Sequence, residues 1–346
     1  MCLRDLNGAQ GVRHGACTHT YAIINTRTGA RIGCEAFPVT QPGMRRAIAW
    51  INRNTDGRVL AAVEGTSSYG SSIRRALGPA GTRVVEVKPP RKQARAGVGK
   101  TDEIDATAAA MSVLGHGAEA LIEPRSDGIR AAINVLLSAR RRVEQQSTAN
   151  RNALNALVRQ IDLGLDTRKA LTDRQVTEIS SWHKRPSDTV EQRYARDEAV
   201  ELATAVLAGQ RRLKAIRDEL TPLGEELAPG MQDLPGFGPV TVGIILAAYS
   251  HRGRIRSEAS FAALAGAAPL QASSGNTTRH RLNRHGDRQL NMALDIIVKT
   301  RLRCHTESKD YLERRTAEGR NYKEIKRSLK RYLARSIFRK LQQLVA

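Results

Sequence analysis

Two periodicities of apolar residues alternate along the first third of the chain. Between Thr18 and about Gly115, runs with a period of two residues are interleaved with runs of helical period. The first period predicts strands over 21–25 and 32–39, joined by the turn Thr28-Gly29-Ala30. The pattern then predicts a helix over 44–51, a strand over 59–64, a helix over 69–77 and a strand over 84–87.

This order of elements indicates an α/β domain. Two antiparallel strands that lead into a β-α-β unit are the arrangement of an RNase H-like fold, and a generic α/β domain is the alternative. Residues 1–10 lack an apolar strand ahead of the hairpin. The chain has 346 residues, which is enough for two domains.

The central part of the chain, residues 129–227, is predicted to be helical and rich in charge. Apolar residues recur with an approximate helical period before residue 161 and again after residue 200. The polar segment 182–185 and Pro186 separate the two stretches. Two interpretations stay open, namely an antiparallel helical hairpin that spaces two domains and a coiled coil between protomers.

The last part of the chain, from Leu234, is predicted to be helical with one interruption over 268–287. We therefore predict an α/β domain over 1–125, a helical linker over 126–228 and a C-terminal helical domain over 229–346. The fold class is α/β followed by all-α.

Positive charge dominates the composition. Lys and Arg number 56 against 34 Asp and Glu, which gives a formal net charge of +22. Such a balance predicts a polyanionic partner, either nucleic acid or an anionic membrane surface. No run approaches the roughly 18 apolar residues of a spanning helix, and no apolar signal core follows Met1. We therefore expect a cytoplasmic, nucleoid-associated protein with no membrane partner.

A run of basic residues in the C-terminal tail favours nucleic acid. A solvated helix face is the plain alternative, but in so basic a chain we expect the tail to lie along phosphates. Aromatic residues make up only 4% of the chain, so recognition should rely on phosphate contacts rather than extended base stacking. The basic residues of the tail include Lys323, Lys326, Arg327, Lys330, Arg331, Arg335, Arg339 and Lys340.

Carboxylates, rather than cysteines, are the candidate metal ligands. The four cysteines are scattered without a C-x-x-C pair. Glu64 ends a buried strand, whereas Asp102 and Asp105 stand three residues apart in the first turn of a predicted helix and share one face. Hard carboxylate oxygens suit Mg²⁺, and the neighbouring Lys100 could balance them or contact phosphate. Taken singly, each acid is better explained as a helix cap or a surface residue.

A second candidate site lies in the interruption of the C-terminal helices. Ser274 stands before Gly275 in a turn, and a serine nucleophile needs such an exposed backbone together with cations that stabilise developing charge. On its own, Ser273-Ser274-Gly275 is an ordinary turn. The cations available nearby are Arg279, His280, Arg281, Arg284, His285 and Arg288.

The segment Leu234–Pro239 resembles the hairpin of helix-hairpin-helix proteins. Gly236 and Gly238 would let backbone N–H groups approach a phosphate at the start of the apolar helix that follows. A plain connection between two helices, with no ligand, is the alternative.

Four segments resemble the IS110 family of DEDD-type insertion-sequence transposases. The similarity covers almost the whole chain in the right order, and the last segment is highly specific. The segments are EGTSSYG (64–70), GKTDEIDATAAA (99–110), LPGFGPVTVG (234–243) and FAALAGAAPLQASSGNTTRHRLNRHGDRQLNMAL (261–294).

The resemblance implies an N-terminal RuvC-like nuclease domain, in which Glu64, Asp102 and Asp105 hold Mg²⁺, and a C-terminal transposase domain. It implies that the serine directly before the glycine, Ser274 rather than Ser273, attacks a DNA phosphate and forms a phosphoserine intermediate. It also implies that donor and target DNA pair with a structured bridge RNA. The protein would act as a dimer or a dimer of dimers, in which the acids of one protomer could meet the serine of another.

The N-terminus departs from the family pattern. The family's first acid lies on the first strand in a pattern such as Gly-Val-Asp-Thr-His-Lys-Asp-Thr-His, and this chain matches its end at Thr18-His19. Arg13 therefore stands where the first aspartate is expected. A guanidinium cannot ligate a cation and would repel one. This predicts a displaced start, an upstream frameshift or a degenerate copy, with weak metal binding.

These observations predict an RNA-guided, Mg²⁺-dependent DNA transposase, or site-specific recombinase, with a serine nucleophile. Two alternatives remain. One is a catalytically inactive protein that still binds nucleic acid, and the other is a metal-only junction nuclease in which Ser274 is structural.

Overall fold

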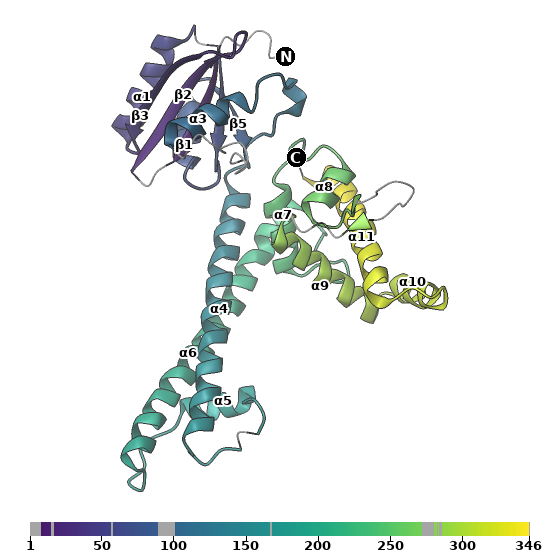
Figure 1. Ribbon diagram of the computed structural model, residues 1–346. Helices are drawn as coiled ribbons and strands as arrows, with labels where there is room; N and C mark the ends of the chain where they lie inside the picture. The colour runs from purple at the N-terminus through teal and green to yellow at the C-terminus, as the bar shows by residue number, and fades with distance from the viewer. Residues whose placement is uncertain are drawn as a thin grey trace. The chain divides into compact units, whose positions relative to one another are not determined.

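The computed structural model describes residues 8–14, 17–56, 58–88, 101–166, 168–271, 280–281, 283 and 286–345 (Figure 1). The chain divides into two compact units, Met1–Arg125 and Ser126–Ala346. The first unit is α/β and the second is almost entirely helical, so the structure is of mixed α/β class, as the sequence predicts.

A five-stranded sheet forms the centre of the first unit. Its strand order is β3-β2-β1-β4-β5, with β1, β2 and β3 antiparallel in succession and β4 parallel to both β1 and β5. The predicted hairpin is present, and its turn is closed by the Asn25 side chain, which accepts from the backbone N–H of Arg27 and Thr28. The strands are β1 Gly8–His14, β2 Thr18–Asn25, β3 Arg31–Pro38, β4 Val59–Glu64 and β5 Arg83–Val87.

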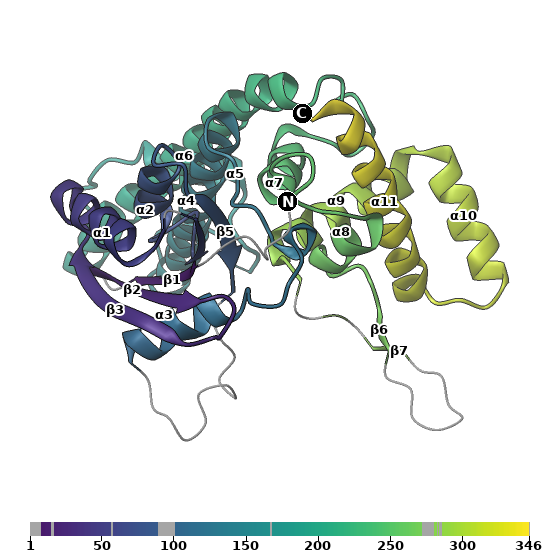
Figure 2. The ribbon, with the colours of Figure 1, turned by 90° about the horizontal axis from the view of Figure 1, so that it is seen from above.

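Helices cover both faces of this sheet (Figure 2). Helices α1 (Gln41–Asn54) and α2 (Ser71–Leu77) bury Ala47, Ile51, Ile73 and Leu77 on one face. Helix α3 (Asp102–Met111) packs against β1 and β2 on the other face. The 3-10 turn Ala118–Ala120 follows.

The structure contains an N-terminal strand that the periodicity did not predict. β1 begins at Gly8 and occupies the centre of the sheet. Its backbone pairs with β2 from Gly8 to His14 and with β4 from Gly8 to Val12. A strand with neighbours on both sides can satisfy its backbone hydrogen bonds through them, so it forms despite a weak apolar pattern.

A long helical hairpin opens the second unit. Helices α4 (Ile129–Gln160) and α6 (Val190–Leu227) pack against each other within one chain. Each helix therefore has an intramolecular partner for its apolar face, as the hairpin interpretation predicts. The short helix α5 (Asp173–Ser180) packs on α6, and the sequence pattern missed it. Its signal is a capping box, in which Thr172 and Gln175 satisfy each other's backbone N–H groups.

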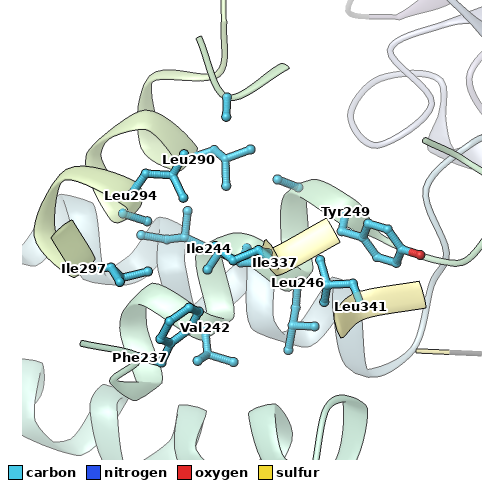
Figure 3. Close-up of a cluster of buried hydrophobic side chains, with 14 of the residues drawn as sticks. Phe237, Val242, Ile244, Leu246, Tyr249, Leu290, Leu294, Ile297, Ile337 and Leu341 are labelled. Carbon is cyan, nitrogen blue, oxygen red and sulfur yellow. The ribbon is translucent and has the colours of Figure 1, made fainter. Parts of the chain in front are cut away.

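The remaining helices enclose the largest hydrophobic core (Figure 3). Helix α7 is buried on nearly every side, as its uninterrupted apolar sequence requires. Ile133 of α4 and Leu220 of α6 belong to the same cluster, so the base of the hairpin and the C-terminal helices share one core. The helices are α7 Pro239–Tyr249, α8 Glu258–Leu264, α9 Arg288–Cys304, α10 Thr306–Ala317 and α11 Tyr322–Leu344. None of the helices described is both long and apolar enough to cross a membrane.

Candidate functional site

Glu64 lies at the carboxyl end of a buried parallel strand. It is the last residue of β4, where its backbone pairs with Val87 of β5. Side chains alternate along a strand, and Val59, Ala61 and Val63 pack toward α1 and α2. Glu64 therefore belongs to the opposite face, the one that α3 covers.

Asp102 and Asp105 begin α3, as the sequence predicts, but their environments differ. Thr101 caps the helix, with its Oγ1 accepting from the N–H of Ile104 at 3.3 Å. Asp102 is exposed, whereas Asp105 is completely buried on the side of α3 that faces the sheet. Burial of a carboxyl group against the sheet carries a desolvation cost, so Asp105 is an unusual residue for a helix that otherwise buries alanine.

The register of β1 places Arg13 beside the Glu64 position. Val12 is paired with Val63 of β4, and Arg13 and Glu64 are the next residues of the two parallel strands. On its other side, the backbone of Arg13 is paired with Thr20 of β2. The register therefore places the backbone of Arg13 level with that of Glu64 on the neighbouring strand.

The described residues do not fit a metal centre. Within the described ranges, no group of three or more His, Cys, Asp or Glu side chains is arranged to hold a metal ion. The sequence motif predicts Arg13 at the remaining position of the acid set, and a guanidinium donates hydrogen bonds and cannot ligate a cation. Glu64, Asp102 and Asp105 stay predicted ligands, and Lys100 lies outside the described residues.

The described residues include the base of the segment that carries Ser274, whereas Ser274, Arg279 and Arg284 lie outside them. A two-residue ladder, β6 (Leu270–Gln271) with β7 (His280–Arg281), brings its two ends together. Helices α8 and α9 flank it, as the sequence predicts. Arg288 is exposed at the first position of α9.

Close backbone packing joins the two sides of this base. A Cβ on Gly286 would lie 2.4 Å from the amide nitrogen of Gly266 and 2.8 Å from the carbonyl oxygen of Leu264. The N–H of Asp287 donates to that same carbonyl oxygen at 2.6 Å, and Asn283 Nδ2 donates to Ala263 O at 3.2 Å. Glycine at 286 is therefore a steric requirement of this closure.

A polar network behind the loop base connects α9 with α11. Asn291 donates through Nδ2 to Ala265 O at 2.7 Å and accepts through Oδ1 from Lys330 Nζ at 3.0 Å. Lys330 Nζ also lies 2.9 Å from Asp295 Oδ1, and its side chain is 12% exposed. Sequence reasoning proposed Lys330 as a phosphate contact and missed Asn291 and Asp295. The only local signal was the spacing of Asp295 and Lys299 on one helix face.

Asp295 is the charge partner of three lysines. Lys299 and Lys326 lie 2.9 Å and 3.1 Å from its oxygens, in addition to Lys330. Partial burial raises the pKa of Asp295, but the hydrogen bonds from Lys330, Lys299 and Lys326 outweigh it and hold the pKa well below its usual range.

The hairpin at Leu234–Pro239 is explained in part by packing. Gly236 has φ +87°, and a Cβ there would lie 3.0 Å from Ile297 Cα, so α9 leaves no room for a side chain. Arg301 fastens the hairpin by donating to Pro235 O at 3.1 Å and by stacking over the Phe237 ring. Gly238 caps α7 and has open space around it, so it is the glycine that a ligand could approach.

Comparison with known proteins identifies two family matches. Residues 12–162 match the model DEDD_Tnp_IS110, described as a transposase, and residues 230–313 match the model of the transposase IS116/IS110/IS902 family. No curated protein matches the chain. The first match includes Arg13 and all three acids, and the second includes the loop base and Ser274. Lys330 and Arg331 on α11 lie outside both matches.

Proposed function

Because the chain belongs to the IS110 family of transposases, we propose that it cuts and rejoins DNA strands through Ser274. Transposase membership makes DNA its substrate. The observation that supports the serine most strongly is the closed loop base between α8 and α9, which would hold a nucleophile loop at fixed ends.

The proposed chemistry is transesterification at phosphorus. The Ser274 Oγ forms a bond to the phosphorus, the bond from phosphorus to the leaving deoxyribose oxygen breaks, and the serine proton is transferred to that leaving oxygen. A hydroxyl of another strand then attacks the phosphoserine, the bond from phosphorus to the serine oxygen breaks, and the proton of the attacking hydroxyl returns to Ser274. Arg281 and Arg288, with Arg279 and Arg284, are the proposed cations that stabilise the extra negative charge on the phosphoryl oxygens.

The N-terminal unit is proposed to be a RuvC-like, RNase H-like domain, because its sheet has three antiparallel strands followed by two parallel ones. Further proposals rest on the family resemblance alone. They are a structured bridge RNA that pairs with donor and target DNA, and assembly as a dimer or a dimer of dimers. Mg²⁺ stays a proposed cofactor, but no step is assigned to it because the described acids do not form its site.

A second candidate function is supported by Arg13. A member of the family with an arginine at the first acid position could bind nucleic acid without cutting it. The central place of β1 and its register beside Glu64 favour this candidate over a simple misalignment of the motif.

The test compares Ser274→Ala and Ser273→Ala in the unaltered chain and in an Arg13→Asp chain. We expect Ser274→Ala to abolish strand exchange and the covalent DNA adduct, with DNA affinity changed less than about twofold, because one hydroxyl adds little to many phosphate contacts. Ser273→Ala should be milder.

Strand exchange that survives Ser274→Ala but is lost in Asp102→Ala would reject the serine and favour a metal-only nuclease. Activity absent from the unaltered chain but present with Arg13→Asp would establish the second candidate function for the natural sequence.

A further inference from the structure

A cleft of about 720 Å³ opens beside the base of the Ser274 segment. One side is lined by Gly266–Pro269, which leads into β6, together with Asn283 and Asn291, and the other by Arg315 of α10, Arg320 and one face of α11. All of its walls belong to the second unit. The α11 wall lies beyond residue 313, outside both family matches.

The lining of this cleft is strongly basic. Its six cationic side chains are Arg315, Arg320, Arg327, Lys330, Arg331 and Arg335. Its one acid, Glu324, is engaged in the helix cap, where its Oε2 accepts from the N–H of Asn321 at 3.2 Å. The cleft therefore carries a large excess of positive charge.

Three of these six cations already have acidic partners. Lys330 is held by Asp295, Arg335 Nε donates to Glu258 Oε2 at 2.7 Å, and Arg315 pairs with Glu318. The other three, Arg320, Arg327 and Arg331, have no acidic partner within the part of the chain that the structure describes. Their charge is available to a ligand.

The geometry of the available arginines suits a linear anion. Arg327 and Arg331 are one helical turn apart on α11, so their side chains leave the same face about 6 Å from each other. Arg320 comes from the turn that precedes α11. A cleft of this volume is of the size that holds a multi-group ligand rather than a single phosphate.

Tyr332 adds a second feature expected of a nucleotide site. It lines the same cleft, is 56% exposed, and is braced edge-on by Tyr311 with a ring separation of 6.0 Å. A braced, exposed ring next to unpaired guanidinium groups is the combination that single-strand binding proteins use for bases and phosphates.

We propose that this cleft binds the sugar-phosphate backbone of a single nucleic-acid strand beside the serine loop. Arg327 and Arg331 contact its phosphates, Arg320 contacts a flanking phosphate, and Tyr332 stacks on a base. Lys330, which is held in place by Asp295 and Asn291, braces the loop base and does not contact the strand. The assignment of the strand as DNA rests on the proposed function. The inference that the ligand has a phosphodiester backbone rests on the side chains that line the cleft.

The test measures binding of a short single-stranded DNA oligonucleotide as a function of salt. Each neutralised phosphate of a single strand contributes about 0.7 to the magnitude of the log-log slope, so Arg327→Ala with Arg331→Ala should lower it by about 1.4. The matched control is Arg142→Ala with Arg211→Ala, which removes two exposed arginines from α4 and α6. The control should leave the slope nearly unchanged, and Arg327→Lys with Arg331→Lys should retain most of it.

Equal slopes for the cleft variant and the control would overturn the proposal, because binding would then depend on net charge alone. Tyr332→Ala should weaken binding about tenfold and Tyr332→Phe should not, since stacking needs the ring and not the hydroxyl. Inorganic phosphate that competes as well as the oligonucleotide would also overturn it.

Two further measurements, with RNA and with Ser274→Ala, distinguish this proposal from the proposed function. RNA of the same sequence that binds more tightly than DNA, with the same loss in the cleft variant, would identify the strand as RNA and overturn the DNA assignment. Loss of strand exchange in Ser274→Ala does not bear on the cleft, because that variant should bind the oligonucleotide normally. If Ser274→Ala retained strand exchange, the proposed function would fail. The binding measurements would still show whether the cleft binds a nucleic-acid strand.

Discussion

Arg13 stands where the sequence motif predicts the first acid of the family pattern. The backbone of Arg13 lies one residue beyond the Val12–Val63 pair of β1 and β4. An arginine there contributes positive charge where the family pattern has a carboxylate. Asp105, by contrast, has a fully buried carboxyl group on α3, and burial of such a group carries a desolvation cost.

We predict that Arg13→Asp raises Mg²⁺-dependent strand exchange by at least about tenfold, because it exchanges a repelling cation for a ligand. Arg27→Asp is the matched control, since Arg27 is exposed in the turn between β2 and β3 and the change in charge is identical. The measurement is the rate of strand exchange as a function of Mg²⁺ concentration for the unaltered chain and both variants. Strong Mg²⁺-dependent activity in the unaltered chain would show that three acids suffice.

Helices α9 and α11 are joined by charge rather than by apolar packing alone. Asp295 of α9 forms ion pairs with Lys326 and Lys330 of α11. Lys330 also donates a hydrogen bond to Asn291, which contacts the loop base. At the far end of α11, Glu258 of α8 binds both Arg335 and Arg339. Hydrogen bonds from these two arginines hold the pKa of Glu258 below its usual range.

We predict that Asp295→Asn lowers the free energy of unfolding by roughly 1–3 kcal/mol near neutral pH, because three lysines lose their shared carboxylate. The folded pKa of Asp295 is depressed below the unfolded value of about 3.9, so its stabilisation is complete above that pH. It is lost as the pH falls through the folded value. Urea unfolding of both proteins across this range should show the difference shrinking below about pH 4.

The control for this prediction is Asp310→Asn on α10, where the carboxylate is exposed and no ion pair is found among the described residues. Its effect should be small and should not change with pH. A difference between Asp295→Asn and the unaltered protein that persists undiminished at low pH would contradict the charge network.

At the scale of the whole molecule, a formal net charge of +22 should govern affinity for nucleic acid. We predict that binding of duplex DNA weakens steeply with salt, by about 0.9 in log-log slope for each neutralised phosphate. Filter binding or fluorescence anisotropy over a range of salt checks this, with unrelated sequences as the comparison. Affinity that barely changes with salt would contradict the electrostatic argument.

The sequence by itself determined the local elements and the family. The strand that ends at Glu64, the helix that begins at Asp102 and the interruption between α8 and α9 follow from periodicity, capping and turn residues, which act over a few positions. The motif blocks around them were specific enough to identify the family. Short-range signals of this kind do not depend on which distant segment becomes the neighbour.

Only the tertiary structure decided which residues meet. β1 forms because β2 and β4 supply its hydrogen bonds, and no pattern within residues 8–14 required that. Asp102 and Asp105 share a helical turn, yet the sheet buries one and leaves the other exposed. Lys330 and Arg331 are adjacent in a basic run, but packing against α9 pairs the first with Asp295, whereas the second lines the cleft. Burial and charge pairing depend on contacts between segments that are distant in the sequence. These contacts exist only in the folded chain, so local sequence patterns do not predict them.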